Sequence, residues 1–308
     1  MALSSSFPPL SGAVLAIVFI LMSTVACGHR TSRHHHHHHD PWESFQNLSG
    51  CHLGDHRTGV AHLKQYFHHF GYLPGSPANF SDDFDHELES ALLAYQHNFH
   101  LNATGILDTS TLSLVTKPRC GVADVVNGTT PRRARGRSLY SHFPGRPSWP
   151  SNKRHLTYGF TARSVPSPIR ALVARAFTRW SDFTVFSFSE ADIASADISI
   201  SFFRGNHGDG AAFDGMGGVL AHAFAPTNGR LHVDVDEHWV VQGDVTTSSS
   251  PNAMDLESVM VHEIGHILGL GHSDVRGAIM YPSIAARTRK VALTNDDVWG
   301  IQNLYGSK

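Results

Sequence analysis

The sequence predicts an α+β fold in which a small three-helix domain precedes a larger domain with a twisted mixed sheet. The first sign is helical spacing of apolar residues in the N-terminal third, as at Val60, Leu63 and Phe67. The second is a later alternation of short β-rich runs with longer helical patterns, which begins at His155. The third is a basic run, Arg132–Arg137, typical of an exposed linker. A chain of 308 residues with 41% hydrophobic content can form two domains with real cores.

Three helices are expected in the N-terminal domain. Apolar residues recur at helical spacing from Val60 to Phe70 and again from Leu88 to Phe99. A third, short helix is expected in residues 102–114, capped by Asp108. The aromatic residues at these positions are expected in the core rather than on a glycan-binding surface.

The larger domain is expected to contain four strands and three helices, which the pattern places in one order along the chain. That order is strand 156–160, helix 167–181, strands 183–190 and 197–203, a polar loop, strand 231–235, helix 256–268 and helix 295–304.

The helix expected at 256–268 carries the residues of a hydrolytic zinc site. His262 and His266 are four residues apart, so they share one face and can bind one ion. Gly269 can take a left-handed conformation that ends the helix and returns the chain, which makes His272 the third ligand. Three protein ligands leave a fourth position for water, whose pKa falls to about 7. Glu263 is the expected general base, which activates water and then protonates the leaving amine of a peptide bond.

Two motifs carry a resemblance to a known family. The HExxHxxGxxH pattern, followed by Met280, resembles the metzincin zinc proteases, whose methionine turn lies under the metal. The run Pro118–Asp124 resembles the cysteine switch of matrix metalloproteinases, the matrixins. This resemblance implies that Cys120 binds the zinc in a latent form, where the catalytic water belongs. It covers nearly all of residues 52–306 and looks most like the plant type without a hemopexin-like domain.

The polar stretch 207–237, rich in His, Asp and Gly, is expected to bind structural ions, as in the matrixin pattern. Three nitrogens and one carboxylate would close a four-coordinate zinc site, with the ligands His207, Asp209, His222 and His232. Hard oxygen ligands suit calcium, and those expected are Asp214, Gly215, Gly217, Val219, Asp234 and Glu237. A second calcium near Asp197 or Asp236 stays open.

Substrate-binding residues are implied by the resemblance alone. An extended substrate is expected beside the strand that carries Leu220 and Ala221. A hydrophobic specificity pocket is expected with walls from Val261, Tyr281 and Pro282.

The N-terminal region is typical of a secreted precursor. Residues 1–26 are expected to be a signal peptide, although they lack a basic n-region and an uncleaved anchor stays open. Residues 27–51 contain His34–His39, which is either a native tract or an engineered tag. Cys27 and Cys51 could pair, unless Cys27 leaves with the signal peptide.

The remaining boundaries divide a precursor into removable and catalytic parts. They are residues 52–124 for a propeptide with a peptidoglycan-binding-like helical module, 125–137 for a basic processing linker and 138–308 for the catalytic domain. Glycosylation sequons all precede the catalytic domain, at Asn47, Asn79, Asn102 and Asn127. The linker is expected to be cut by an activating protease.

The resemblance therefore implies a secreted zinc endopeptidase, made as a zymogen, that acts on proteins of an extracellular matrix or cell wall. A net charge of −2 argues against nucleic acid, and no stable membrane anchor is expected. We expect a monomer, located in the apoplast or cell wall if the source is a plant. Two other classes stay open: a module that binds a wall glycan through residues 52–116, and an inactive structural protein.

Overall fold

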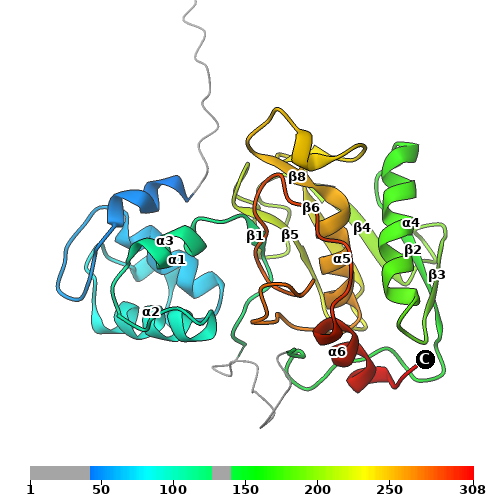
Figure 1. The fold of residues 1–308 in the computed structure, drawn as a ribbon, viewed down its shortest axis with the longest axis horizontal. Helices are drawn as coiled ribbons and strands as arrows, with labels where there is room; N and C mark the ends of the chain where they lie inside the picture. The colour runs from blue at the N-terminus through cyan, green and yellow to red at the C-terminus, as the bar shows by residue number, and fades with distance from the viewer. Residues whose placement is uncertain (1–41, 127–139) are drawn as a thin grey trace, which may run out of the picture. The chain divides into compact units, whose positions relative to one another are not determined.

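The computed structural model describes residues 42–126 and 140–308, and its first domain is the expected group of three helices (Figure 1). They are α1 (Val60–His69), α2 (His86–Asn98) and α3 (Thr109–Val115), with short 3-10 helices η1 (Glu43–Leu48) and η2 (Pro77–Asn79) beside them. Asp85 and Asp108 cap α2 and α3, because each side chain accepts a hydrogen bond from a backbone N–H in the first turn. The prediction of three helices and of the Asp108 cap is confirmed.

The aromatic residues of this domain form its core. Phe45, Phe67, Phe70 and Tyr95 are at most 1% exposed. Their rings meet largely edge to face, as between Phe67 and Tyr95, whose centroids lie 5.4 Å apart. The expectation that these rings are core residues is confirmed, and they offer no exposed platform for a sugar ring.

The second domain is built on a mixed sheet of six strands in the order β1-β5-β6-β4-β2-β3. The strands are β1 (Arg119–Cys120), β2 (His155–Phe160), β3 (Ser187–Glu190), β4 (Ile198–Phe203), β5 (Val219–Ala223) and β6 (Arg230–Asp234). All neighbours are parallel except β5 and β6, which makes the sheet mixed as predicted. Two further short strands, β7 (His238–Val240) and β8 (Ala253–Asp255), pair with each other near the 3-10 helix η3 (Val245–Thr247).

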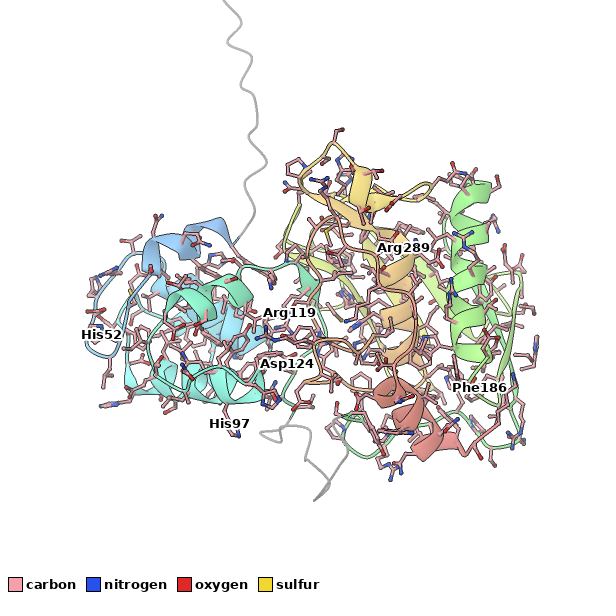
Figure 2. All side chains as sticks on the ribbon, in the orientation of Figure 1. His52, His97, Arg119, Asp124, Phe186 and Arg289 are labelled. Carbon is pink, nitrogen blue, oxygen red and sulfur yellow. The ribbon has the colours of Figure 1, made fainter. Side chains whose placement is uncertain are left out.

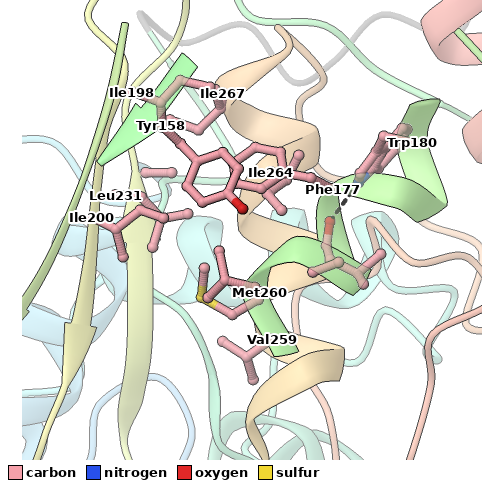
Figure 3. Close-up of a cluster of buried hydrophobic side chains, with 14 of the residues drawn as sticks. Tyr158, Phe177, Trp180, Ile198, Ile200, Leu231, Val259, Met260, Ile264 and Ile267 are labelled. Atoms are coloured by element: carbon pink, nitrogen blue, oxygen red, sulfur yellow. Dashed lines mark hydrogen bonds between the residues drawn. The ribbon is translucent and has the colours of Figure 1, made fainter. Parts of the chain in front are cut away.

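Helices α4 (Ser167–Ser181) and α5 (Leu256–Ile267) pack against each other over the sheet, and α6 (Asn295–Tyr305) ends the fold (Figure 1). The indole of Trp180 on α4 donates a hydrogen bond to the carbonyl of Val261, with 2.8 Å between the two atoms (Figure 3). All twelve residues of α5 are buried. Packing against α4 and the core therefore holds α5 in place, and the face of α5 away from α4 carries side chains that can build a site.

One expected strand begins later than predicted. The sequence pattern starts it at residue 183, but Phe183 closes the turn after α4, where its N–H donates to the carbonyl of Trp180, and β3 begins at Ser187. The side chain of Phe183 is exposed and does not pack in the sheet. The preference of phenylalanine for strands therefore misplaced the start of this strand.

Some predictions fall outside the described residues. These are the signal peptide, Cys27, the His34–His39 tract, the Asn127 sequon and the Arg132–Arg137 linker. The other three sequon residues, Asn47, Asn79 and Asn102, are exposed. Within residues 42–126 and 140–308 the structure contains no helix with the length and apolar character needed to cross a membrane.

Gly265 is the point where α5 is packed most tightly. A Cβ added there would lie 2.2 Å from the sulfur of Met280 and 2.9 Å from the indole of Trp180. Helix propensity would favour alanine by about 1 kcal/mol, but overpacking a core costs about 1–3 kcal/mol. We expect Gly265→Ala to lower the free energy of unfolding, measured in urea.

Gly277 provides the matched control for this substitution. A Cβ there meets nothing within 4 Å, and its φ is not positive. Gly277→Ala should change the free energy of unfolding by less than about 0.5 kcal/mol. Equal stability of the two variants would contradict the packing argument.

Candidate active site

The sequence of α5 fixes where its functional side chains point. Asp255 caps the helix and accepts hydrogen bonds from the N–H and hydroxyl of Ser258, at 2.9 and 2.6 Å. Gly269, at φ 103°, ends the last turn in the left-handed conformation. A Cβ at Gly269 would lie 2.6 Å from the carbonyl oxygen of Pro147, so the close approach also requires glycine. The chain can then return His272 to the helix.

The three predicted zinc ligands come together as expected from their spacing. Nε2 of His262 and Nε2 of His266 are 3.1 Å apart, and the rings of His266 and His272 have centroids 4.8 Å apart. One ligand atom from each histidine and the sulfur of Cys120 all lie within 4.8 Å of one another. Four soft or borderline donors this close are suited to a tetrahedral zinc ion.

Hydrogen bonds to the other ring nitrogens orient these histidines. Nδ1 of His262 lies 2.7 Å from the carbonyl oxygen of Ile279, and Nδ1 of His266 lies 2.8 Å from that of Leu270. A carbonyl only accepts, so each Nδ1 is the donor and each Nε2 keeps its lone pair. Burial and the neighbouring histidines hold the pKa of both rings well below the usual value. Both rings are therefore neutral, as metal ligands must be.

Cys120 reaches this group from β1 and is itself buried. Its Sγ lies 3.4 Å from Nε2 of His266 and accepts a hydrogen bond from the N–H of Val122. Burial, and then the charge of Glu263, raise the pKa of the Cys120 thiol well above its usual range. A metal ion reverses this, because a thiol that coordinates a metal loses its proton.

Glu263 lies in the same enclosure, next to the thiol of Cys120. Its side chain is fully buried, and its carboxylate interacts with that thiol. Burial raises the pKa of Glu263 to about 8. A carboxylate whose pKa is near neutral can take and return a proton at little cost, which is what a general base needs.

Met280, the residue of the expected methionine turn, packs against α5, the helix that carries His262 and His266. It is 1% exposed and faces Gly265 of α5. The carboxylate of Asp297 accepts hydrogen bonds from the N–H groups of Ile279 and Met280, at 2.9 and 3.0 Å. Helix α6 thus fixes the turn that carries Met280.

Asp124 is a site residue that the sequence did not reveal as one. Its Oδ1 lies 2.6 Å from Nη2 of Arg119 and 2.7 Å from Nδ1 of His272. Figure 2 labels Asp124 and Arg119, which lie close together. Burial opposes its charge, but Arg119 and His272 outweigh burial and lower the pKa of Asp124 to about 2. The PRCGVAD run contains Asp124, yet nothing in its spacing shows that the carboxylate contacts a zinc ligand.

The second predicted zinc site is also assembled. Oδ2 of Asp209 lies 2.9 Å from His207, 2.7 Å from His222 and 2.9 Å from His232. All four side chains are at most 6% exposed, and their ligand atoms lie within 4.8 Å of one another. Burial lowers the pKa of His222 to about 4 and keeps this ring neutral. A closed set of three nitrogens and one carboxylate fits structural zinc.

The predicted calcium ligands are neighbours, but several bond to backbone amides. Asp214 accepts from the N–H of Val219, and Glu237 from that of Gly217, both at 2.8 Å. Burial raises the pKa of Asp234 to about 6, and its Oδ2 is buried without a hydrogen-bond partner. That oxygen fits a hard cation. Across residues 42–126 and 140–308, the acidic side chains here do not form a further close ligand group, so calcium stays a prediction.

The open alternative of a second calcium gains no support. Asp197 accepts hydrogen bonds from Thr157 and pairs with Lys153. Asp236 pairs with Arg204. Each candidate carboxylate is already engaged by a cation.

A pocket beside the metal group contains most of the predicted substrate residues. Its lining is Cys120, Leu220, Ser258, Val259, His262, Glu263, Ile279, Tyr281, Pro282, Ser283, Ile284 and Lys290. Ala221 lies next to it on β5, where its carbonyl accepts from the N–H of Gly121 at 2.8 Å.

Val261 does not line this pocket, which corrects the expected pocket wall. Its side chain is fully buried in the core of the second domain. Successive helical residues are 100° apart, so the face that turns Val259, His262 and Glu263 toward the pocket turns Val261 away from it. Lys290, which the sequence analysis missed, also lines the pocket.

Comparison with known proteins gives a consistent result for both parts of the chain. Residues 148–306 match the family model described as Matrixin, and residues 56–115 match a putative peptidoglycan binding domain. The chain is 48% identical to Metalloendoproteinase 2-MMP of Arabidopsis thaliana, over 86% of this chain and 75% of that protein. It is 47% identical to Metalloendoproteinase 1 of Glycine max, over 86% and 87%. It is 39% identical to the hatching enzyme of Paracentrotus lividus, over 82% and 40%.

Proposed function

We propose, since the chain belongs to the matrixin family and is a zinc metalloendopeptidase, that it is made as a latent precursor in which Cys120 blocks the catalytic metal. One observation carries the proposal: the Cys120 sulfur lies 3.4 Å from Nε2 of His266, inside the group formed with His262 and His272. Three histidines would leave one position in a four-coordinate zinc site, which the sulfur would fill.

The roles of the site residues follow from their geometry. His262, His266 and His272 would hold the zinc through Nε2, because Nδ1 of each ring is engaged elsewhere. Zinc, when bound, polarises the scissile carbonyl and makes water more acidic. Glu263 takes the proton of the attacking water and then passes it to the departing amine. The protein needs no nucleophilic side chain for this reaction.

The same site suggests how a substrate is held. Once β1 has left with the propeptide, Leu220 and Ala221 would present the freed edge of β5 to an extended peptide, and a substrate side chain would enter the pocket bounded by Tyr281 and Pro282. Strand pairing of this kind gives affinity through backbone hydrogen bonds, and the pocket gives specificity.

Two further ions would stiffen the second domain. His207, Asp209, His222 and His232 hold a structural zinc, which the closed geometry of the group supports. Calcium is held at Asp214, Asp234 and Glu237 with the carbonyls of Gly215, Gly217 and Val219; the buried oxygen of Asp234 supports this. Residues 138–308, the proposed catalytic domain, have no cysteine, so bound ions are its natural cross-links.

The precursor is secreted and cut to release the enzyme. We place the propeptide in residues 52–124, the linker in 125–137 and the catalytic domain in 138–308, with an activating protease acting at Arg132–Arg137. Exposed Asn47, Asn79 and Asn102 are compatible with a glycoprotein. Because these relatives come from plants, we place the enzyme in the apoplast or cell wall, where it would act as a monomer on extracellular proteins.

The test is hydrolysis of a fluorogenic peptide by the intact precursor, before and after a thiol-reactive mercurial. We expect activity to rise at least about tenfold. If the Cys120 sulfur stabilises the blocked site by about 1.4 kcal/mol or more, its modification shifts the equilibrium between blocked and open sites at least about tenfold. Cys120→Ser should be active without the reagent, and a zinc chelator should abolish activity in every case.

Cys51 provides a matched control, since it is a second buried free thiol in the core of the three-helix domain. Cys51→Ala should respond to the mercurial like the wild type. If Cys120→Ser stayed latent while it bound zinc, Cys120 would not be the latch.

A further inference from the structure

The three histidines of the catalytic group differ in what holds their second ring nitrogen. His262 and His266 bond to carbonyls of Ile279 and Leu270, both within the second domain. His272 instead bonds to a carboxylate, that of Asp124, at 2.7 Å. Asp124 follows Cys120 by four residues and leaves with the propeptide when the precursor is cut. One candidate ligand is thus oriented by the segment that blocks the site.

Burial makes this contact strong. The side chains of Asp124 and His272 are 1% and 4% exposed, and Arg119, which neutralises the carboxylate at 2.6 Å, is 2% exposed. A carboxylate only accepts, so Nδ1 of His272 is the donor and Nε2 keeps its lone pair. That Nε2 is buried and has no hydrogen-bond partner among the described residues. It therefore faces the metal group ready to bind.

We call residues 118–124, which carry Cys120, the latch segment. We propose that Asp124 gives this segment a second function, which is to retain the metal. Asp124 orients His272 and strengthens His272 as a ligand for as long as the propeptide is attached. The inference rests on the proposed zinc site. A carboxylate behind a ligating histidine raises the basicity of the ring and fixes its tautomer, and its loss typically lowers metal affinity about 10–100-fold. After processing, His272 has to exchange Asp124 for water or another acceptor.

The decisive experiment measures zinc affinity of the full-length precursor by competition with a chromophoric chelator. Asp124→Asn suits this purpose, because asparagine keeps an acceptor for Arg119 and His272 but loses the charge. We expect its affinity to fall about tenfold or more relative to wild type. The absorption spectrum of the cobalt-loaded precursor should change as well, since a spectrum reports the ligand field rather than activity.

A Cys120→Ser background separates the two functions of the segment. If Asp124 acts through His272, Asp124→Asn should lower zinc affinity by a similar factor with or without the Cys120 thiol. If Asp124 merely holds Cys120 in place, the effect should disappear in the Cys120→Ser background, and our inference would be wrong. Latency is scored separately, by the activity of Cys120→Ser alone, so that the proposed function and this inference can fail independently.

His100 supplies a matched control from the same domain. Its Nε2 pairs with Asp274 at 2.9 Å, which is another contact between the propeptide and the catalytic domain, but it does not touch the metal group. His100 has φ 56°, a value that asparagine tolerates, so His100→Asn is the suitable change. Its zinc affinity should equal that of the wild type; a tenfold loss would show that any weakened propeptide contact releases metal.

Wild-type protein gives an independent check if Asp124→Asn fails to fold. In the zinc-loaded precursor with ¹⁵N-labelled histidine, a buried imidazole N–H bonded to a carboxylate should exchange slowly. One such resonance should shift or vanish after the propeptide is removed, while those of His262 and His266 persist. No change in any of them would overturn the proposal.

Discussion

Activated protein that carries Glu263→Gln is expected to hydrolyse peptides about 10²–10⁴-fold more slowly than the wild type and to bind the same amount of zinc. Glutamine keeps the shape of the side chain but cannot take a proton. Glu263 is also fully buried, and no other described carboxylate lines the pocket beside the metal group that could replace it. The measurement is kcat/KM on a fluorogenic peptide, with zinc content determined on the same sample.

Glu257 is the control for this experiment, because it is a second buried glutamate on α5, six residues earlier. It pairs with Arg175 and Arg289 at 3.0 and 2.9 Å rather than facing the pocket. Glu257→Gln should lower the melting temperature but keep activity per folded molecule. A Glu263→Gln enzyme with a tenth or more of wild-type kcat/KM would place the general base elsewhere.

His222→Ala is expected to reduce bound zinc from two ions to one per chain and to lower stability sharply. A ligand present at a thousand times its Kd stabilises the folded state by about 4 kcal/mol, and this is what the variant stands to lose. Zinc content and thermal unfolding with and without added zinc measure the two effects. His238, exposed on β7, is the control, and His238→Ala should match the wild type in both.

Acid should also lower the stability of the metal-free protein. Burial lowers the pKa of His222 to about 4 in the folded state and also lowers that of His232, whereas unfolded histidine titrates near 6.5. The unfolded chain therefore binds protons first, so stability is lost as the pH falls from about 6.5 to 4. The slope is at most about 1.4 kcal/mol per pH unit for each group. In His222→Ala the slope should be shallower; an unchanged slope would assign the acid sensitivity to other groups.

The sequence predicts well those features that depend on residues close together in the chain. Helix α4 begins and ends at the predicted residues, because its apolar spacing and the proline at its start lie within the helix itself. The zinc ligands of α5 are likewise four residues apart on one turn. The prediction that Val261 lines the pocket was wrong, because a shift of one residue along a helix turns a side chain from the pocket to the core. Asp124 and His272 are 148 residues apart, so no local pattern could reveal their contact.

The pairing of β1 with the sheet has a consequence for the kinetics of activation. The latch segment bonds on both sides: Arg119 and Gly121 donate to carbonyls of the β5 segment, while Cys120 and Pro118 bond to Pro282 and Ile284. Because the latch is covalently part of the chain, it competes with substrate at an effective concentration that is of millimolar order for a flexibly tethered group. Cleavage of the chain removes that advantage without breaking a single one of these bonds. The cut precursor should therefore lose inhibition with dilution and time, at the rate at which the freed segment dissociates, rather than at the moment of cleavage.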